Sequence, residues 1–336
     1  MLKEPTPLLK STFFFGDDVP DSAFGNSSTM LSYVALAAAA FAPGLSPMSM
    51  APAMRAVAPV MQTGTLDAEL VKTYPRDFKN IPTGTAYGAG ADEVANKEEE
   101  DERLEAKLAI LKSTLQKVVD TKERPIFTTA LIAGDCVIMD VIAKLGLQDK
   151  IKVIFIDTFF LFEESVSFMK EVEDYYGIKA VRYQCADCKD AEEFYDKYGE
   201  DYWMTDLEDY DKKCKVEPLM RAMKETDTDS WINGRRRDHG AERASLPVWE
   251  GNKVNPLAHW TFEECWNYLR KYEVPYHPLH DVGFSSLGDV QSTKKVPHQT
   301  WFTYAGERSG RFEGMKAKDG SSKTECGIHS FDANAK

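Results

Sequence analysis

Short apolar runs alternate with segments of helical periodicity through the middle of this 336-residue chain. Four runs are suited to buried strands, and they cover residues 126–133, 151–156, 178–183 and 231–233. Three helical segments separate them, at residues 135–145, 162–169 and 191–198. Because strands that alternate with helices form parallel sheets covered on both faces, the pattern predicts an α/β fold with a doubly wound, mostly parallel sheet.

Ligands of such a sheet bind beyond the carboxyl ends of its strands. The loops that follow Ala133, Asp157, Tyr183 and Asn233 are therefore the expected place for a site. Farther along, Thr261 followed by Glu264 predicts the capping box of one more helix. After Tyr272 the chain is rich in loops, so we expect a loop-rich C-terminal tail.

A stripe of apolar residues marks the beginning of the folded body. Its members lie three or four residues apart, as on one face of a helix, and are Leu104, Leu108, Leu111, Leu115 and Val118. The acidic run at residues 98–102 would open this helix, where negative charge suits the helix dipole, and we interpret it as solvated surface. We predict one domain over residues 98–330.

The sequence before this domain has a different composition. Between Ser22 and Met61 there is no acidic residue and one arginine, with many Ala, Pro, Ser and Met residues. This composition is typical of a targeting leader, and its apolar stretch is short for a membrane span. We predict a plastid-directed leader over residues 1–61, no membrane attachment of the mature protein, and an extended or mobile connector over residues 62–97. A disordered N-terminus is the alternative.

The charge balance limits the kinds of partner. The chain has 54 acidic and 41 basic residues and a net charge of −13, which argues against nucleic-acid binding because that requires a basic surface. An anionic ligand would need a local group of cations to bind against this field. Six cysteines are too few for a dense disulfide framework in a chain of this length and fit a reducing compartment.

Basic residues gather just past the fourth predicted strand. Arg235, Arg236 and Arg237 follow Gly234, and Arg243 comes six residues after the last of them. The planar guanidinium fork matches the oxygens of phosphate or sulfate. We therefore predict an anion site in this loop.

Other polar residues give weaker signals. Lys213 and Lys215 follow a predicted helix and loop, where solvated surface is the simpler interpretation. Lys294 follows Thr293, and a hydroxyl beside a lysine suits oxyanion binding. Asp157 ends the second strand, where a carboxylate binds a ribose hydroxyl, orders a loop or caps a helix.

The cysteines do not form a metal-binding pattern. Cys185 and Cys188 form one Cys-x-x-Cys, and a zinc site would need a second pair at suitable spacing, which the sequence lacks. We interpret them as two unlinked thiols, with a redox-active pair as the alternative. The prediction is that no metal is bound.

Cys326 lies in the run Glu325-Cys326-Gly327-Ile328-His329. A thiolate is a soft nucleophile, Gly327 lets the backbone bend, and His329 brings a proton carrier within reach. Taken alone, the run could also be an ordinary terminal loop.

In order along the chain, several runs together resemble the sulfonucleotide reductases, which reduce adenylyl sulfate (APS) or its 3′-phosphorylated form (PAPS) to sulfite. The matching runs are Asp157-Thr158 with Leu161-Phe162-Glu163-Glu164, Lys215-Val216-Glu217-Pro218-Leu219, Gly234-Arg235-Arg236-Arg237 with Arg243-Ala244-Ser245-Leu246-Pro247-Val248, Asn255-Pro256-Leu257-Ala258-His259-Trp260-Thr261, Pro275-Tyr276-His277-Pro278-Leu279-His280-Asp281 with Gly283-Phe284, and Glu325-Cys326-Gly327-Ile328-His329.

This resemblance implies an adenine-nucleotide α-hydrolase-like (PP-loop) fold and a role for each matching residue. Cys326 and His329 are the implied catalytic residues. The residues implied to bind the substrate are Asp157, Lys215, Arg236, Arg237, Arg243, Lys294, Thr129 and Gly134. The Cys326 thiolate, with its pKa lowered by the cations, would attack sulfur, and thioredoxin or glutathione (with glutaredoxin) would release sulfite from the S-sulfo-cysteine. A homodimer is expected.

Some positions depart from the family pattern. Tyr210-Asp211 and the run 289–292 replace the cysteine pairs that hold a [4Fe-4S] cluster in many APS reductases, so we expect a cluster-free enzyme without a cofactor. The nucleotide loop at residues 128–135 has fewer hydroxyls than the family's serine-rich form, and Phe159 replaces a glycine.

The leader and the thinned loop favour APS over PAPS by a narrow margin. Two other classes of protein are alternatives. A sulfonucleotide-binding protein without turnover would fit the altered loop but not the retained Cys326. An ATP pyrophosphatase would need an intact phosphate loop, which this sequence lacks.

Overall fold

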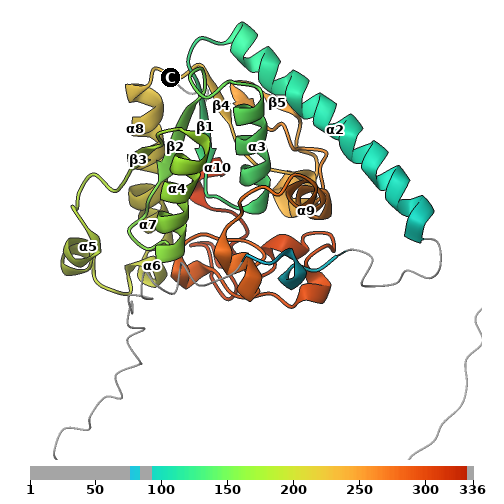
Figure 1. Cartoon of the computed structure of the whole chain (residues 1–336). Coiled ribbons are helices and arrows are strands. Elements are labelled where there is room, and N and C mark those ends of the chain that lie inside the picture. The colour runs from blue at the N-terminus through green and yellow to red at the C-terminus, as the bar shows by residue number, and fades with distance from the viewer. Residues whose placement is uncertain (1–75, 84–92, 331–336) are drawn as a thin grey trace, which may run out of the picture. The chain divides into compact units, whose positions relative to one another are not determined.

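The computed structural model describes residues 76–83 and 93–330. Within these residues the centre is a six-stranded sheet with the order β3-β2-β1-β4-β6-β5, part of which is visible in Figure 1. All neighbouring strands are parallel except β5 and β6, which pair antiparallel at one edge. The predicted mostly parallel sheet is confirmed. The strands are β1 (Pro125–Thr129), β2 (Lys152–Ile156), β3 (Val181–Tyr183), β4 (Ser230–Ile232), β5 (Trp249–Glu250) and β6 (Lys253–Val254).

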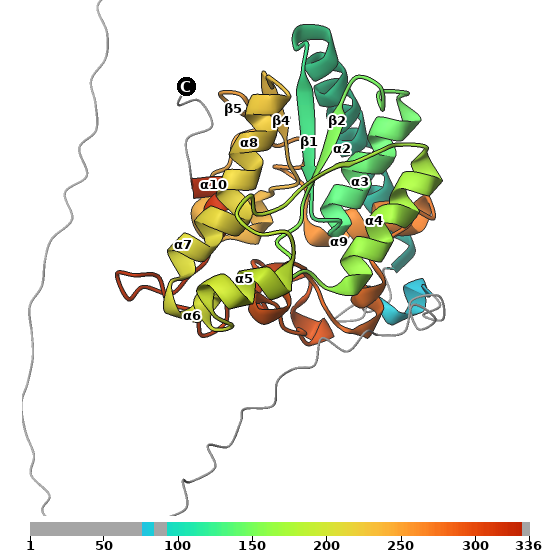
Figure 2. The ribbon, with the colours of Figure 1, turned by 90° about the vertical axis from the view of Figure 1, so that its left-hand side faces the viewer.

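Helices cover both faces of this sheet. Figure 2 shows α8 on one side of β1 and β2 and α3 and α4 on the other. The predicted capping box of α9 is present, with Thr261 and Glu264 bonded to each other's backbone N–H groups. The helices are α2 (Glu93–Thr121), α3 (Ala133–Lys144), α4 (Glu163–Tyr176), α5 (Ala191–Tyr198), α6 (Tyr202–Thr205), α7 (Leu207–Asp211), α8 (Glu217–Glu225), α9 (Phe262–Lys271) and α10 (Gly327–Ser330).

Alternation along the central strands divides the core into two layers. Phe127 of β1 joins the larger layer, which includes the buried stripe of α2 and the inner faces of α3 and α9. Its neighbour Ile126 joins a smaller layer with Leu219 and Ala222 of α8. Successive side chains of a strand point to opposite faces, so the two layers lie on the two faces of the sheet, as in a doubly wound fold.

The first strand is shorter than the apolar run predicted. β1 ends at Thr129, the backbone turns at Leu131 with φ 60°, and α3 begins at Ala133. A leucine in this left-handed region is unusual for an L-residue. The apolar residues after Thr129 therefore form the turn that faces the carboxyl end of the strand.

The helix expected to open at the acidic run 98–102 begins earlier, at Glu93. Within the predicted connector, residues 76–83 pack against the body: the ring of Phe78 lies 4.9 Å from that of Tyr276, and Ile81 is buried. Arg270 donates to the carbonyl of Ile81 at 3.2 Å. The predicted leader, residues 1–61, lies outside the described residues.

A π-helical turn joins α7 to α8. The turn spans Lys212–Val216, and the N–H of Glu217 donates to the carbonyl of Lys212, five residues back. Pro218 follows directly and has no N–H to donate, so a regular helix cannot pass through it unperturbed. Lys215, for which its position in the sequence alone favoured solvated surface, is buried in this helical turn.

Of the helices in the described part of the chain, none has both the length and the apolar character that a membrane crossing requires.

Candidate active site

A cavity of about 160 Å³ lies at the carboxyl ends of the parallel strands, where the fold predicts a ligand. The loops after β1, β2 and β4, the π-helical turn, residues 286–289, Arg308 and Arg311 provide its walls. The tail, which we define as residues 313–330, contributes Cys326, Ile328 and His329. The predicted site residues that line the cavity are Thr129, Lys215, Arg243, Cys326 and His329.

Cys326 enters this cavity at the start of α10, which packs beside α7 and the π-helical turn, as Figure 2 shows. The N–H of Gly327 donates to Asp211 at 3.1 Å. A Cβ on Gly327 would lie 3.0 Å from Val216 and 3.2 Å from the Cβ of Asp211. Glycine is therefore suited to this position because the tail approaches the helix so closely.

Lys215 is a buried cation of the π-helical turn that lines the cavity. Its Nζ lies 2.6 Å from Asp211 and 2.7 Å from Asp289. Burial alone would lower the pKa of Lys215, but Asp289 and Asp211 outweigh this effect and raise it. Lys323 of the tail lies 2.7 Å from Asp211, so two lysines and two carboxylates form one balanced network.

Arg243 binds the tail directly. Its Nε and Nη2 lie 2.6 and 2.7 Å from the two oxygens of Glu325, in a bidentate pair. Its Nη1 lies 2.7 Å from Nδ1 of His239, whose Nε2 contacts Glu307 at 2.9 Å. His239 thus holds the guanidinium of Arg243 at Nη1, while its Nε and Nη2 atoms face the cavity.

Three further arginines line the cavity: Arg235 of the predicted arginine cluster, and Arg308 and Arg311, which were not among the predicted site residues. Arg308 donates to the carbonyl of Thr324 at 3.0 Å, and Arg311 lies against the backbone at Gly288. Arg235 is held by amide oxygens and by Glu250 at 2.5 Å. A signal for two of them was present, because Arg308-Ser309-Gly310-Arg311 places two arginines around a glycine.

Arg236 and Arg237 lie outside the cavity walls. Arg236 is fully buried, with its guanidinium paired with Asp238 and Glu307. Arg237 donates from Nε to the carbonyl of Leu246 at 2.8 Å. The backbone of Arg236 is extended, and neighbouring side chains in extended chain point to opposite sides, so Arg235 faces the cavity and Arg236 faces the core.

Asp157 and Lys294 also lie outside the cavity walls. The Asp157 carboxylate is buried and accepts hydrogen bonds from Arg182, Gln184 and the N–H of Phe159. Of the roles left open for Asp157, these contacts correspond to ordering the loop. Lys294 is exposed and pairs with Glu313 at 3.0 Å.

The nucleotide loop contains a buried carboxylate. Asp135 accepts from the N–H of Ala130 at 2.7 Å and from the Thr129 hydroxyl at 3.3 Å. Burial raises the pKa of Asp135 to about 7. A Cβ on Gly234 would lie 2.2 Å from this carboxylate, and one on Gly134 would lie 2.9 Å from Arg236. Both glycines permit close packing, and Gly134 is not part of the cavity wall.

His329 stacks on the indole of Trp231, with ring centroids 5.5 Å apart and planes 10° from parallel. Burial, with Arg243 as the next cause, lowers the pKa of His329 well below its usual value. The ring is therefore neutral at neutral pH. Its Nδ1 has no hydrogen-bond partner among the described residues.

The pKa of Cys326 is raised in this closed arrangement. Burial is the main cause and the charge of Glu325 is the next, and together they outweigh Lys215 and Arg308, which act in the opposite direction. The cations lower the pKa of Cys326 as expected, but they do not offset burial and Glu325, so the expected net lowering is wrong for this arrangement. The thiol is protonated until the electrostatics around it change.

The donor atoms of Glu325, Cys326 and His329 lie within 4.8 Å of one another, as in a metal site, in the part of the chain that the structure describes. Arg243 and Arg308 lie beside this group, and their positive charges oppose a bound cation. The arrangement suits an anion better than a metal.

The positions of the implied iron-sulfur ligands do not fit a cluster. Tyr210 and Asp211 occupy the first pair, and Asp289 begins the second, so the donors there are oxygens. The phenol of Tyr210 donates to Asp289 at 3.0 Å. The carboxylates of Asp211 and Asp289 both pair with Lys215. A cluster needs four thiolates, and salt bridges occupy these places.

The remaining cysteines are free and buried. Cys185 and Cys188 pack with Phe194 and with Cys214 of the π-helical turn in a small aromatic cluster behind Lys215. Their interpretation as unlinked thiols agrees with this arrangement.

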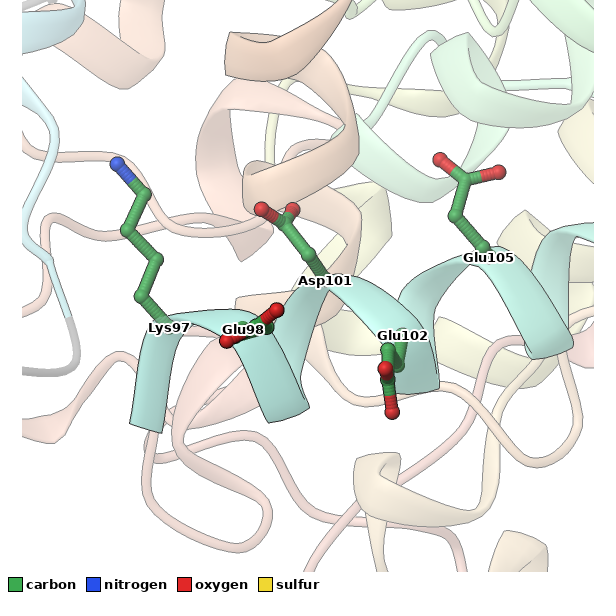
Figure 3. Close-up of a pocket in the computed structure, with 5 residues that line it drawn as sticks. All are labelled: Lys97, Glu98, Asp101, Glu102 and Glu105. Carbon is green, nitrogen blue, oxygen red and sulfur yellow. The ribbon is translucent and has the colours of Figure 1, made fainter. Parts of the chain in front are cut away.

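An acidic stretch of α2, shown in Figure 3, contains Lys97, Glu98, Asp101, Glu102 and Glu105. Glu102 points away from Asp101 and Glu105 in this view, so the carboxylates do not converge. Lys271 lies 3.3 Å from Asp101 and 2.8 Å from Glu105. The stretch is a helix surface with local ion pairs.

Comparisons with known proteins agree with the motifs. Residues 124–295 match the family model described as phosphoadenosine phosphosulfate reductase domain. A probable phosphoadenosine phosphosulfate reductase of Schizosaccharomyces pombe is 38% identical over 60% of this chain and 73% of its own length. An adenosine 5′-phosphosulfate reductase of Lysinibacillus sphaericus is 32% identical over 57% of this chain and 78% of its own. A phosphoadenylyl-sulfate reductase structure from Candida auris superposes with a TM-score of 0.50 at 29% identity, over 62% of this chain and 99% of that one.

Proposed function

The chain belongs to the phosphoadenosine phosphosulfate reductase family and is an oxidoreductase of that family, and from this premise we propose that it reduces APS to sulfite and AMP with Cys326 as nucleophile. One observation carries the proposal. Cys326 lines the same cavity as Lys215, Arg243, Arg308 and Arg311, so a thiol and a group of cations meet at the place where this fold binds its ligands.

The cations support attack on a sulfur that is shielded by anionic oxygens. The Cys326 thiolate forms a bond to the sulfuryl sulfur, and the bond from that sulfur to the phosphate oxygen breaks with its electron pair. Lys215 and the arginines stabilise the charge that develops on the departing AMP. His329 is neutral, so we assign it to orienting Cys326 or the leaving oxygen and not to donating a proton as an imidazolium.

A second step regenerates the thiol. An external thiolate attacks the Cys326 sulfur, sulfite leaves with the electron pair, and a second thiol resolves the mixed disulfide. Sulfur is thereby reduced by two electrons while two thiols become a disulfide. Thioredoxin or glutathione (with glutaredoxin) as the donor, the plastid location and the homodimer stay predictions.

The size of the cavity supports a moving tail. Small-molecule sites usually occupy about 300–1,000 Å³, whereas this cavity has about 160 Å³. The tail would therefore open to admit the nucleotide and close again for the chemical step. Opening would also expose Cys326 to the external thiol.

The choice between APS and PAPS depends on one additional phosphate. Asp135 adds a carboxylate to a loop that has few hydroxyls, and its negative charge disfavours an additional anionic group there. This supports APS, which lacks the 3′-phosphate. PAPS is a second candidate, because Arg235 offers the cavity one more cation and several of the similar proteins are named phosphoadenosine phosphosulfate reductases.

Sulfite release from labelled APS and PAPS, measured in parallel with reduced thioredoxin or glutathione, tests the proposal. We expect turnover of APS that the substitution Cys326→Ser abolishes, with nucleotide binding retained. Turnover of PAPS alone would overturn the substrate while leaving the mechanism. Binding without turnover of either nucleotide would contradict the reductase assignment and favour a binding protein.

A further inference from the structure

The carboxylate of Glu325 occupies the anion-binding edge of Arg243 in the closed structure. Its two oxygens lie 2.6 and 2.7 Å from Nε and Nη2 of that side chain, and Arg308 lies 3.4 Å from it. Burial alone would raise the pKa of Glu325, but Arg243 and Arg308 hold it well below its usual value. A sulfuryl or phosphoryl group presents the same pair of oxygens, so Glu325 stands where an anionic group of the substrate would bind.

Glu325 also contacts its neighbour Cys326. The N–H of Cys326 donates to Oε1 of Glu325 at 3.0 Å, and the Cys326 sulfur lies 3.6 Å from the same oxygen. A carboxylate at this distance disfavours the thiolate. One side chain therefore neutralises the main anion-binding fork and keeps the nucleophile in its less reactive form.

The rest of the tail has contacts that do not depend on this pair. Gly327 donates to Asp211 at 3.1 Å, and Lys323 lies 2.7 Å from Asp211. The hydroxyl of Thr324 donates to Glu242 at 2.8 Å. Because these contacts do not involve Glu325, the tail can close again over a bound nucleotide while an anionic group of that nucleotide occupies Arg243.

We propose that Glu325 is a positioning residue that holds Arg243 in the absence of substrate and is exchanged there for an anionic group of the sulfonucleotide. The exchange frees Cys326 from its contact with a carboxylate, so that substrate arrival and activation of the nucleophile are coupled. The identity of the substrate rests on the proposed function, whereas the exchange itself concerns any anion that binds Arg243.

Glu325→Gln tests the exchange, with Glu242→Gln as the matched control because Glu242 contacts the tail without pairing with a cavity cation. Binding of AMP and of inorganic sulfate would be measured by calorimetry. Alkylation of Cys326 by iodoacetamide would be followed by mass spectrometry across a pH series without nucleotide. We expect Glu325→Gln to bind both anions about tenfold more tightly, because a competing anion has been removed from Arg243. We also expect Cys326 to react about tenfold faster near neutral pH, because the neighbouring carboxylate no longer disfavours the thiolate.

The control should match the wild-type protein in both measurements. Unchanged or weaker anion binding in Glu325→Gln, or an unchanged alkylation profile, would overturn the proposal. Glu325→Ala repeats the test without the amide, in case glutamine keeps the hydrogen bond from Arg243. Neither readout needs turnover, so a protein that reduces no sulfonucleotide would contradict the proposed function and still give a result for the exchange.

Discussion

Replacement of Lys215 by methionine should reverse the pH dependence of the contribution that its buried site makes to the stability of this protein. Lys215 is 6% exposed and separates two buried carboxylates, those of Asp211 and Asp289. Burial raises the pKa of Asp211, but Lys215 and Lys323 outweigh it and hold the value below normal. In the wild type, this carboxylate therefore contributes stability above its unfolded pKa of about 3.9, and the contribution is lost as the pH falls through the depressed folded value.

In Lys215→Met the sign of the effect changes. Two like charges would then face each other in a buried site, and the folded pKa of at least one carboxyl would rise above its unfolded value. Stability would be greatest at low pH and would decrease as the pH rises through the raised pKa. Removing one partner of a buried ion pair costs about 3–5 kcal/mol, so we expect a loss of this size near pH 7.5 and less than about 2 kcal/mol near pH 5.

Urea unfolding, followed by tryptophan fluorescence at both pH values, measures this difference. The triple variant Lys215→Met, Asp211→Asn, Asp289→Asn is the control, because a neutral site of similar volume should recover most of the loss. A loss of equal size at both pH values, or a larger one at the lower pH, would refute the electrostatic reasoning.

Three smaller predictions concern the loop and one helix. Asp135 ionises near pH 7, so AMP binding should weaken several-fold as the pH rises from about 6 to 8, and calorimetry on Asp135→Asn should give a flatter profile; parallel profiles would contradict this. Thr261→Ala should lose about 1 kcal/mol in urea unfolding, with Thr261→Ser near wild type, because the capping box of α9 is removed; no loss would count against the cap. Glu273 is exposed at φ 51° just after α9, so Glu273→Gly should gain about 1 kcal/mol over Glu273→Ala, and a destabilised glycine variant would disprove it.

Periodicity located most of the helices and strands because burial on one face imposes it. Leu104 to Val118 form a buried stripe on α2, and the apolar runs of β1, β2 and β4 supply both layers of the core. The pattern failed where apolar residues serve a turn. The apolar composition of Ala130 to Ala133 predicted that the strand continues, but the backbone turns at Leu131. An apolar run contains no sequence signal for a positive φ.

The candidate site was predictable where a motif and a strand end coincide. Arg243 and Cys326 reach the cavity, whereas Arg236 does not, because consecutive residues of an extended segment face opposite sides. Arg308 and Arg311 lie in irregular chain between α9 and α10, where no periodicity indicates the direction in which a side chain points. The carboxylate of Glu325 at Arg243 depends on a contact across 82 residues, and such a pairing cannot be read from spacing.

The π-helical turn at Lys212–Val216 makes the site sensitive to residue count as well as to residue type. Each residue of a regular α-helix advances the direction of the side chains by about 100°. Asp211 before the turn must face the tail, while Leu219 after it must face the sheet. The wider π-helical turn changes the rotation between the two halves of the helix so that Asp211 faces the tail and Leu219 faces the sheet. Deletion of Lys212, the exposed residue of this turn, would keep every buried residue in the sequence but would rotate one half of the helix against the other and carry Lys215 out of the cavity.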